Sequence, residues 1–146
     1  MAPDAALARA VAQALTGTPG VISVYLFGST AAGRPHRDSD VDVALLLDWG
    51  LYPDRRARFE ARLRAHARLG PALGRDDLDI VVLNDAPPLF ARAIVTTGHR
   101  VVSAEPETDR AFRRDTLLRA ADLAPFLARA RRRLLHALGA APARPA

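Results

Sequence analysis

Apolar and amphipathic stretches alternate along this chain, and most of the changes fall at glycine, proline or aspartate. Runs of mainly apolar and β-branched residues predict three strands and a short fourth edge strand, at residues 21–27, 40–47, 78–83 and 100–103. Apolar residues at helical spacing predict four longer helices, at residues 4–15, 53–69, 87–97 and 107–138. Helices and strands are therefore expected to alternate, and the chain is expected to end in helix.

The second long helix is predicted from its start and stop signals. Pro53 with Asp54 marks its beginning, and Gly70-Pro71 is expected to break it. Its spacing places Phe59 and Leu63 on the inner face, together with His66.

Prolines also mark the two helices that follow. Asn84-Asp85 before Pro87-Pro88 is typical of a helix cap followed by first-turn prolines. Pro125 is expected to kink or split the final helix, because proline removes a backbone donor and clashes with the preceding turn. The apolar positions of this last helix form a stripe at Leu123, Leu127, Ala130, Leu134 and Leu138.

This order of elements predicts an α/β fold, in which helices flank a small mixed β-sheet and a C-terminal helical segment follows. We expect one minimal domain over residues 1–138, with its core at about residues 20–105 and the C-terminal helices at about 107–138. Residues 139–146 are rich in alanine and proline and are expected to form a disordered tail.

The most informative polar residues lie where the first two predicted strands meet. Gly28-Ser29 follows the first strand, and Asp40 and Asp42 come after a gap of ten residues. Glycine lets a backbone approach phosphate oxygens closely, and serine can donate hydrogen bonds to them. Side chains at i and i+2 of a strand share a face, so the two carboxylates repel unless a divalent cation lies between them. This pattern predicts metal-assisted nucleotidyl transfer.

A third carboxylate, Asp79, lies inside the third predicted strand, where aspartate is disfavoured. If this strand lies beside the second, Asp79 can face Asp40 and Asp42. Three carboxylates could then hold two Mg²⁺ ions roughly 3.5–4 Å apart. One ion would activate an attacking hydroxyl, the other would neutralise the triphosphate, and Asp79 could accept the proton of the nucleophile.

The loop between the two halves of this motif adds candidate nucleotide contacts. Arg37 and Ser39 are assigned to binding of the nucleotide, together with Gly28 and Ser29. Arg34 lies in the same loop and could also touch the triphosphate. Ordinary surface arginines are the alternative interpretation of Arg34 and Arg37.

Composition limits which groups can take part. All 21 basic residues other than histidine are arginine and there is no cysteine, which excludes catalytic lysines, thiolate metal sites and disulfides. A net charge of +5 could attract an acidic partner, but aromatic residues are only 5% of the chain, so direct nucleic-acid binding is not expected. The four histidines show no metal-ligand spacing and are predicted to be structural or surface residues: His36, His66, His99 and His136.

Two further patterns concern location. No apolar run approaches the length of a membrane span, and the N-terminal residues lack a basic region followed by an apolar block. The sequence therefore predicts a cytoplasmic protein without membrane association.

The spacing of Gly28-Ser29, Asp40, Asp42 and Asp79 resembles the signature of the polymerase-beta nucleotidyltransferase superfamily. The small size points to its minimal branch, and within that branch the chain resembles MntA-type adenylyltransferase antitoxins, the partners of HEPN-domain toxins. The likeness spans about residues 20–127 and extends to three later segments, at residues 79–84, 86–89 and 122–125.

This resemblance implies a nucleotidyltransferase fold and transfer of AMP from ATP to a hydroxyl, expected to be a tyrosine, of a HEPN-type ribonuclease toxin that is thereby silenced. The implied cofactor is Mg²⁺, and the toxin is the implied partner in a hetero-oligomer. The residues give an independent hint, because the predicted core leaves too little chain for a separate acceptor-binding domain. Another molecule or a second subunit is expected to complete the acceptor site, with the final helical stripe as the candidate docking surface unless it covers the sheet.

Two other functions stay open from the sequence. One is a small-molecule nucleotidyltransferase, of the kind that modifies aminoglycosides, acting with a separate helical subunit. The other is a non-catalytic module that masks a toxin by contact alone. An intact set of three carboxylates argues against the second, because clustered carboxylates without metal cost stability.

Overall fold

The computed structural model describes residues 2–32 and 40–139. Its elements follow the predicted alternation closely: α1 (Ala5–Leu15), β1 (Val21–Leu26), α2 (Gly28–Ala31), β2 (Val41–Leu47), α3 (Arg55–Leu73), β3 (Leu78–Val82), the short 3₁₀ turn η1 (Leu83–Asp85), α4 (Pro88–Thr97), β4 (His99–Ser103) and α5 (Pro106–Ala137). The strands predicted from apolar runs are thus confirmed within one or two residues at each end. The predicted tail from residue 140 lies outside the described residues.

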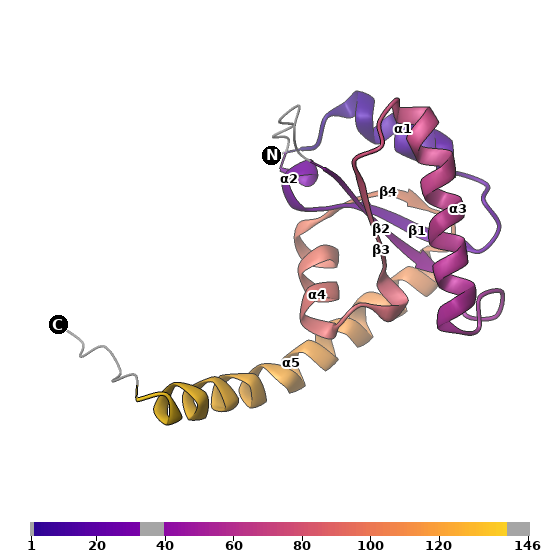
Figure 1. Ribbon diagram of the computed structural model, residues 1–146. Helices are drawn as coiled ribbons and strands as arrows, with labels where there is room; N and C mark the ends of the chain where they lie inside the picture. Colours follow the sequence, from indigo (N-terminus) through magenta and orange to yellow (C-terminus); the bar gives the residue numbers. More distant parts are fainter. Residues whose placement is uncertain (1, 33–39, 140–146) are drawn as a thin grey trace.

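The four strands form one mixed sheet in the order β3-β2-β1-β4. β1 lies antiparallel to both β2 and β4, whereas β3 lies parallel to β2. α1 and α3 pack on one face of the sheet and α4 on the other, where the first turns of α5 join it (Figure 1). The mixed sheet flanked by helices and the short edge strand β4 are therefore confirmed, and β3 forms the opposite edge.

The inner face of α3 differs from the prediction. Phe59 and Leu63 are 52% and 53% exposed, whereas the buried residues of this helix are Arg58, Ala61, Ala65, Leu69 and Gly70. Small alanine side chains let α3 lie close to the sheet and to α1, and this close packing turns the larger apolar side chains outward. The expectation that Phe59 and Leu63 line the inner face is therefore wrong, and His66 is partly buried.

Neither proline splits its helix into two. α3 continues through Pro71 and ends at Gly74, whose left-handed conformation (φ 63°) is favoured by glycine. Pro71 lies only three residues before that end, so few backbone hydrogen bonds are affected. α5 likewise runs unbroken through Pro125 (Figure 1).

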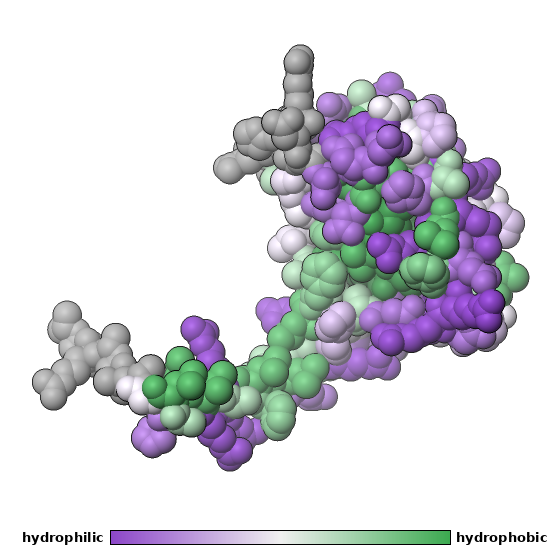
Figure 2. Space-filling view, viewed as in Figure 1, coloured by the Kyte–Doolittle hydropathy of each residue, from purple (hydrophilic) through white to green (hydrophobic). Residues whose placement is uncertain are grey.

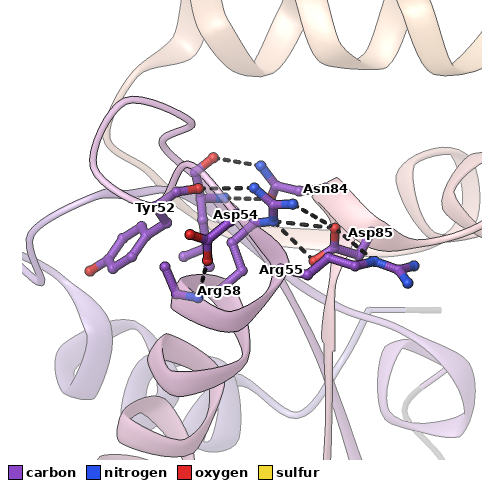
Figure 3. A network of polar contacts seen from close by, with 8 residues as sticks. Tyr52, Asp54, Arg55, Arg58, Asn84 and Asp85 are labelled. Carbon is purple, nitrogen blue, oxygen red and sulfur yellow. Dashed lines mark hydrogen bonds and ion pairs between the residues drawn. The ribbon is translucent and has the colours of Figure 1, made fainter.

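Asn84 and Asp85 do not cap α4, which begins after Pro87 without a side-chain cap. The Asn84 side chain instead pairs with the backbone of Leu47 at the end of β2, donating to its carbonyl at 2.8 Å and accepting from its N–H at 2.9 Å. Asp85 accepts from Arg58 through Nε at 3.0 Å and Nη2 at 2.9 Å, and Arg58 also donates to the carbonyl of Tyr52 (Figure 3). This network joins the start of α3 to the turn after β3.

A second polar network joins α5 to the sheet through Asp109. This carboxylate is fully buried and accepts hydrogen bonds from the Ser23 hydroxyl at 2.7 Å and the Tyr25 hydroxyl at 2.6 Å, both on β1. Arg100 of β4 completes it with an ion pair at 2.6 Å. Because each buried polar group has a partner, the network fixes where α5 leaves the sheet.

Tyr25 gives this network a pH dependence. Burial, with the hydrogen bond to Asp109, raises the pKa of Tyr25 from its ordinary value of 10 to about 12. A group whose pKa is higher in the folded state contributes stability below its unfolded pKa and loses that contribution as the pH rises through the folded one. We therefore expect the free energy of unfolding to fall between pH 10 and about 12.

Urea unfolding at pH 9, 10 and 11 measures this loss, and a Tyr25→Phe variant, which cannot ionise, should lack it. Absorbance of tyrosinate gives a direct check. Ionisation of Tyr25 near its ordinary pKa would contradict the prediction.

The second half of α5 leaves the body of the molecule. Ala120 is the last buried residue of this helix, and beyond it the ribbon extends away from the sheet (Figure 1). Hydrophobic side chains run along this arm (Figure 2), among them Phe126 and Leu134, each 60% exposed, and Leu138, 71% exposed. The stripe therefore does not cover the sheet. Within residues 2–32 and 40–139, no helix is long and apolar enough to cross a membrane.

Candidate active site

The turn after β1 lies directly against the start of β2. The Phe27 N–H donates to the carbonyl of Asp42 at 3.1 Å, and the Asp42 N–H donates to the Thr30 hydroxyl at 2.9 Å. Two hydrogen bonds thus hold the Gly28-Ser29 turn to the strand residue that bears the second carboxylate. Thr30 is a residue that the sequence analysis missed; its place directly after Gly28-Ser29 was the available signal.

Gly28 is required at this turn for two reasons. Its φ of 61° is left-handed, a conformation that side-chain-bearing residues rarely adopt. A Cβ at this position would also collide with the carboxylate of Asp42. Ser29 beside it is exposed, so its hydroxyl is accessible to a ligand. The sequence-predicted phosphate turn therefore lies beside a predicted metal ligand.

The two strands bring Asp42 and Asp79 together. β2 and β3 are parallel neighbours, and Asp42 pairs with Asp79 in their register. Asp40 immediately precedes β2, so it lies just outside the strand in which it was predicted. Asp42 is partly buried, whereas Asp40 and Asp79 are exposed. Arg37 and Ser39 fall outside the described residues, as do Arg34 and His36.

The electrostatics of this edge match a cation site. Burial raises the pKa of Asp42, and the nearby charges of Asp79 and Asp40 raise it further. The candidate ligands at this edge are carboxylate oxygens, which Mg²⁺ prefers. Within the described residues, no group of three or more histidine, cysteine, aspartate or glutamate side chains is placed to hold a metal ion. The fit to Mg²⁺ therefore rests on the type of ligand and on the mutual repulsion of the carboxylates.

Comparison with known proteins identifies the family. The model of the polymerase beta nucleotidyltransferase family matches residues 10–107, and the chain belongs to this family. Protein adenylyltransferase MntA of Shewanella oneidensis is 33% identical over 91 residues, which make up 62% of this chain and 60% of that protein. The match thus spans less than two thirds of the length of this curated relative.

Solved structures show the same fold. A chain of a toxin–antitoxin crystal structure with AMP-PNP has a TM-score of 0.64 and 26% identity, covering 90% of this chain and 97% of that chain. A chain of the complex between a tri-AMPylated Shewanella oneidensis HEPN toxin and its MNT antitoxin has a TM-score of 0.59 and 24% identity, covering 91% and 96%. The predicted nucleotidyltransferase fold and the predicted resemblance to MntA-type antitoxins are both confirmed.

Proposed function

We propose that this protein is an antitoxin that transfers AMP from ATP to a hydroxyl, expected to be a tyrosine, of a cognate HEPN-type ribonuclease toxin and thereby silences it. The observation that carries the proposal is the pairing of Asp42 with Asp79 on adjacent strands, beside the Gly28-Ser29 turn. The relative MntA is a protein adenylyltransferase, and similar chains occur in toxin–antitoxin structures, one of them with AMP-PNP.

Different residues are proposed to bind the triphosphate and the metal ion. Gly28 lets the backbone approach the triphosphate, and the exposed Ser29 hydroxyl can donate to its oxygens. Asp40, Asp42 and Asp79 would hold Mg²⁺, which when bound neutralises phosphate charge and lowers the pKa of a nearby hydroxyl. We also propose that two Mg²⁺ ions bind at this edge and that Arg37 and Ser39 contact the nucleotide.

The reaction balances without any further reactant. The acceptor oxygen attacks the α-phosphorus in line and forms a new P–O bond, while the bond to the bridging oxygen breaks and pyrophosphate leaves. Asp79, exposed on the edge strand, can take the proton of the hydroxyl. Positioning and charge neutralisation supply most of the rate.

The test uses ATP labelled at the α-phosphate, Mg²⁺ and a purified HEPN-type toxin as the partner. The wild type should label the partner, Asp40→Ala/Asp42→Ala should not, and Asp76→Asn, which changes an exposed aspartate before β3, should behave like the wild type. Absence of label, with the partner still neutralised by the double variant, would favour a masking module. Label on a small-molecule hydroxyl without the partner would favour the aminoglycoside type of enzyme.

Gly28→Ala should reduce AMP transfer by about 10²-fold or more, because a displaced Asp42 carboxylate misaligns the reacting groups. Gly74→Ala is a matched control. Its φ of 63° gives alanine the same backbone cost, and nothing lies within 4 Å of the added Cβ. Rates of AMP transfer and thermal midpoints of both variants measure the difference. Equal activity in the two variants would show that contact with Asp42 is unimportant.

A further inference from the structure

An open groove begins at Asp79 and runs along the outer edge of the sheet. Its volume is about 430 Å³, and its floor is formed by four consecutive residues of β3, Asp79 to Val82. One wall comes from α3, with Arg55, Phe59 and Arg62, and the other from the start of α4, with Phe90. Figure 1 shows β3 passing between these two helices. We call this feature the β3 groove.

The floor of the β3 groove is the free edge of a strand. In the described part of the chain β3 pairs only with β2, so its other edge carries backbone groups without a strand partner. An unpaired edge of this kind accepts an extended polypeptide, whose backbone adds a strand while its side chains enter neighbouring pockets.

The walls of the groove offer apolar contacts. Phe59 and Phe90 are 52% and 42% exposed, and they lie on opposite helices beside the same strand. Figure 2 shows hydrophobic residues gathered on this face, with hydrophilic residues around them. Phe90 is held by an edge-to-face contact with Phe27, at 5.9 Å between ring centroids, whereas Phe59 is free to meet a ligand. Exposed aromatic residues of this kind are common anchors at protein interfaces.

The charged residues of the groove indicate the charge of the segment that it binds. Arg55 and Arg62 line it from α3, and the Arg55 side chain is 82% exposed. Asp85 forms ion pairs with both Arg58, at 2.9 Å, and Arg55, at 3.7 Å. Beyond Asp79, three arginines are therefore set against one carboxylate, and the groove is basic. Such a groove favours an acidic segment over a basic one.

We propose that the β3 groove binds the acceptor segment of the protein substrate, in extended form and as an added strand on β3. An apolar or aromatic side chain of the segment lies between Phe59 and Phe90, acidic residues face Arg55 and Arg62, and the acceptor hydroxyl reaches Asp79. This rests on the proposed function, in which the acceptor is a protein hydroxyl. Continuity of the groove with Asp79 is what separates it from other exposed apolar surface, such as the arm of α5.

The first experiment measures steady-state AMP transfer to the purified HEPN-type partner. Phe59→Glu/Arg62→Glu should raise the KM for the partner about tenfold or more and leave the affinity for ATP unchanged. Ala6→Glu/Arg9→Glu is the matched control, because it places two glutamates at the same spacing on exposed positions of α1, away from the groove. If the groove variant labels the partner with wild-type KM, the groove proposal is wrong while the proposed function stands. If the wild type itself labels nothing, the proposed function fails instead.

A second experiment tests docking without catalysis. Hydrogen exchange of residues 79–82 is followed in Asp40→Ala/Asp42→Ala, with and without saturating partner. We expect slower exchange on binding, retained in the background of Ala6→Glu/Arg9→Glu and lost in that of Phe59→Glu/Arg62→Glu. Protection confined to other parts of the chain would overturn the proposal. So would protection that grows with the concentration of this protein alone, since a second copy would then occupy the groove.

Discussion

Replacing Asp42 with asparagine is expected to abolish AMP transfer and, at the same time, to stabilise the metal-free protein. The activity should fall on the order of 10³-fold or more, because a site for divalent cations contributes several kcal/mol to stabilisation of the transition state. The gain in stability has a separate cause. Burial and the charges of Asp79 and Asp40 raise the pKa of Asp42, so its ionised form is unfavourable in the fold.

The pH dependence follows from this direction of the pKa shift. Below the unfolded pKa of an aspartate, about 4, Asp42 is protonated in both states and the variant has no advantage. As the pH rises through the higher folded pKa, the wild type loses stability and asparagine does not. Urea unfolding in EDTA at pH 4, 6 and 7.5 should therefore show a difference that opens above the unfolded pKa and then stays constant above the folded one.

The same measurement with Mg²⁺ separates the two effects. Mg²⁺ should raise the thermal midpoint of the wild type and leave that of Asp42→Asn nearly unchanged, because a ligand that binds only the folded state stabilises it. Asp76→Asn is the control for loss of an exposed aspartate. A variant that is less stable than the wild type at every pH would contradict the assigned cause.

Asp109→Ala is expected to be the most destabilising single substitution considered, at about 3–5 kcal/mol. Removal of this carboxylate leaves the buried hydroxyls of Ser23 and Tyr25 without their acceptor and breaks the ion pair with Arg100. Since domains of this kind are stable by only about 5–15 kcal/mol, much of the protein should be unfolded at 37 °C.

Asp109→Asn keeps an acceptor oxygen and should cost less than the alanine variant, whereas Asp115→Ala removes an exposed aspartate of the same helix and should cost little. Urea unfolding followed by circular dichroism ranks the three. Equal stability of the alanine and asparagine variants would mean that an oxygen accepting from the Ser23 and Tyr25 hydroxyls is unimportant.

The strands, and the approach of two of the predicted site residues, were predictable because both depend on local pattern. Apolar runs between turn residues mark β1, β2 and β3. Asp42 and Asp79 each occupy the second position of their strand, so parallel pairing of these strands brings them together. Asp79 also lies on an edge strand, where a carboxylate stays accessible.

The packing of α3 was not predictable from the helical spacing of its apolar residues alone. Phe59 and Leu63 share one face of the helix, while Ala61, Ala65 and Leu69 share another. Hydrophobicity favours burial of the first set, but close approach of the helix to the sheet favours burial of the second set, which contains small residues. The choice is made by the space between α3 and β3, which no local pattern encodes.

The polar networks were missed for a different reason. Arg58 and Asp85 are 27 residues apart, and Ser23 and Asp109 are 86 apart. A sequence shows that each is a charged or polar residue, but the partner that permits its burial appears only when distant elements meet. The one local signal was that Arg58 shares a face with Ala61 and Ala65.

The free arm of α5 divides the chain into two parts with different constraints. Residues up to Ala120 must satisfy packing and chemistry together, whereas the helix beyond it buries nothing against the body. Substitutions in the arm can therefore accumulate without loss of the fold. Duplicated copies of such a gene are therefore expected to diverge first in the arm, while the packed body of the domain is inherited unchanged.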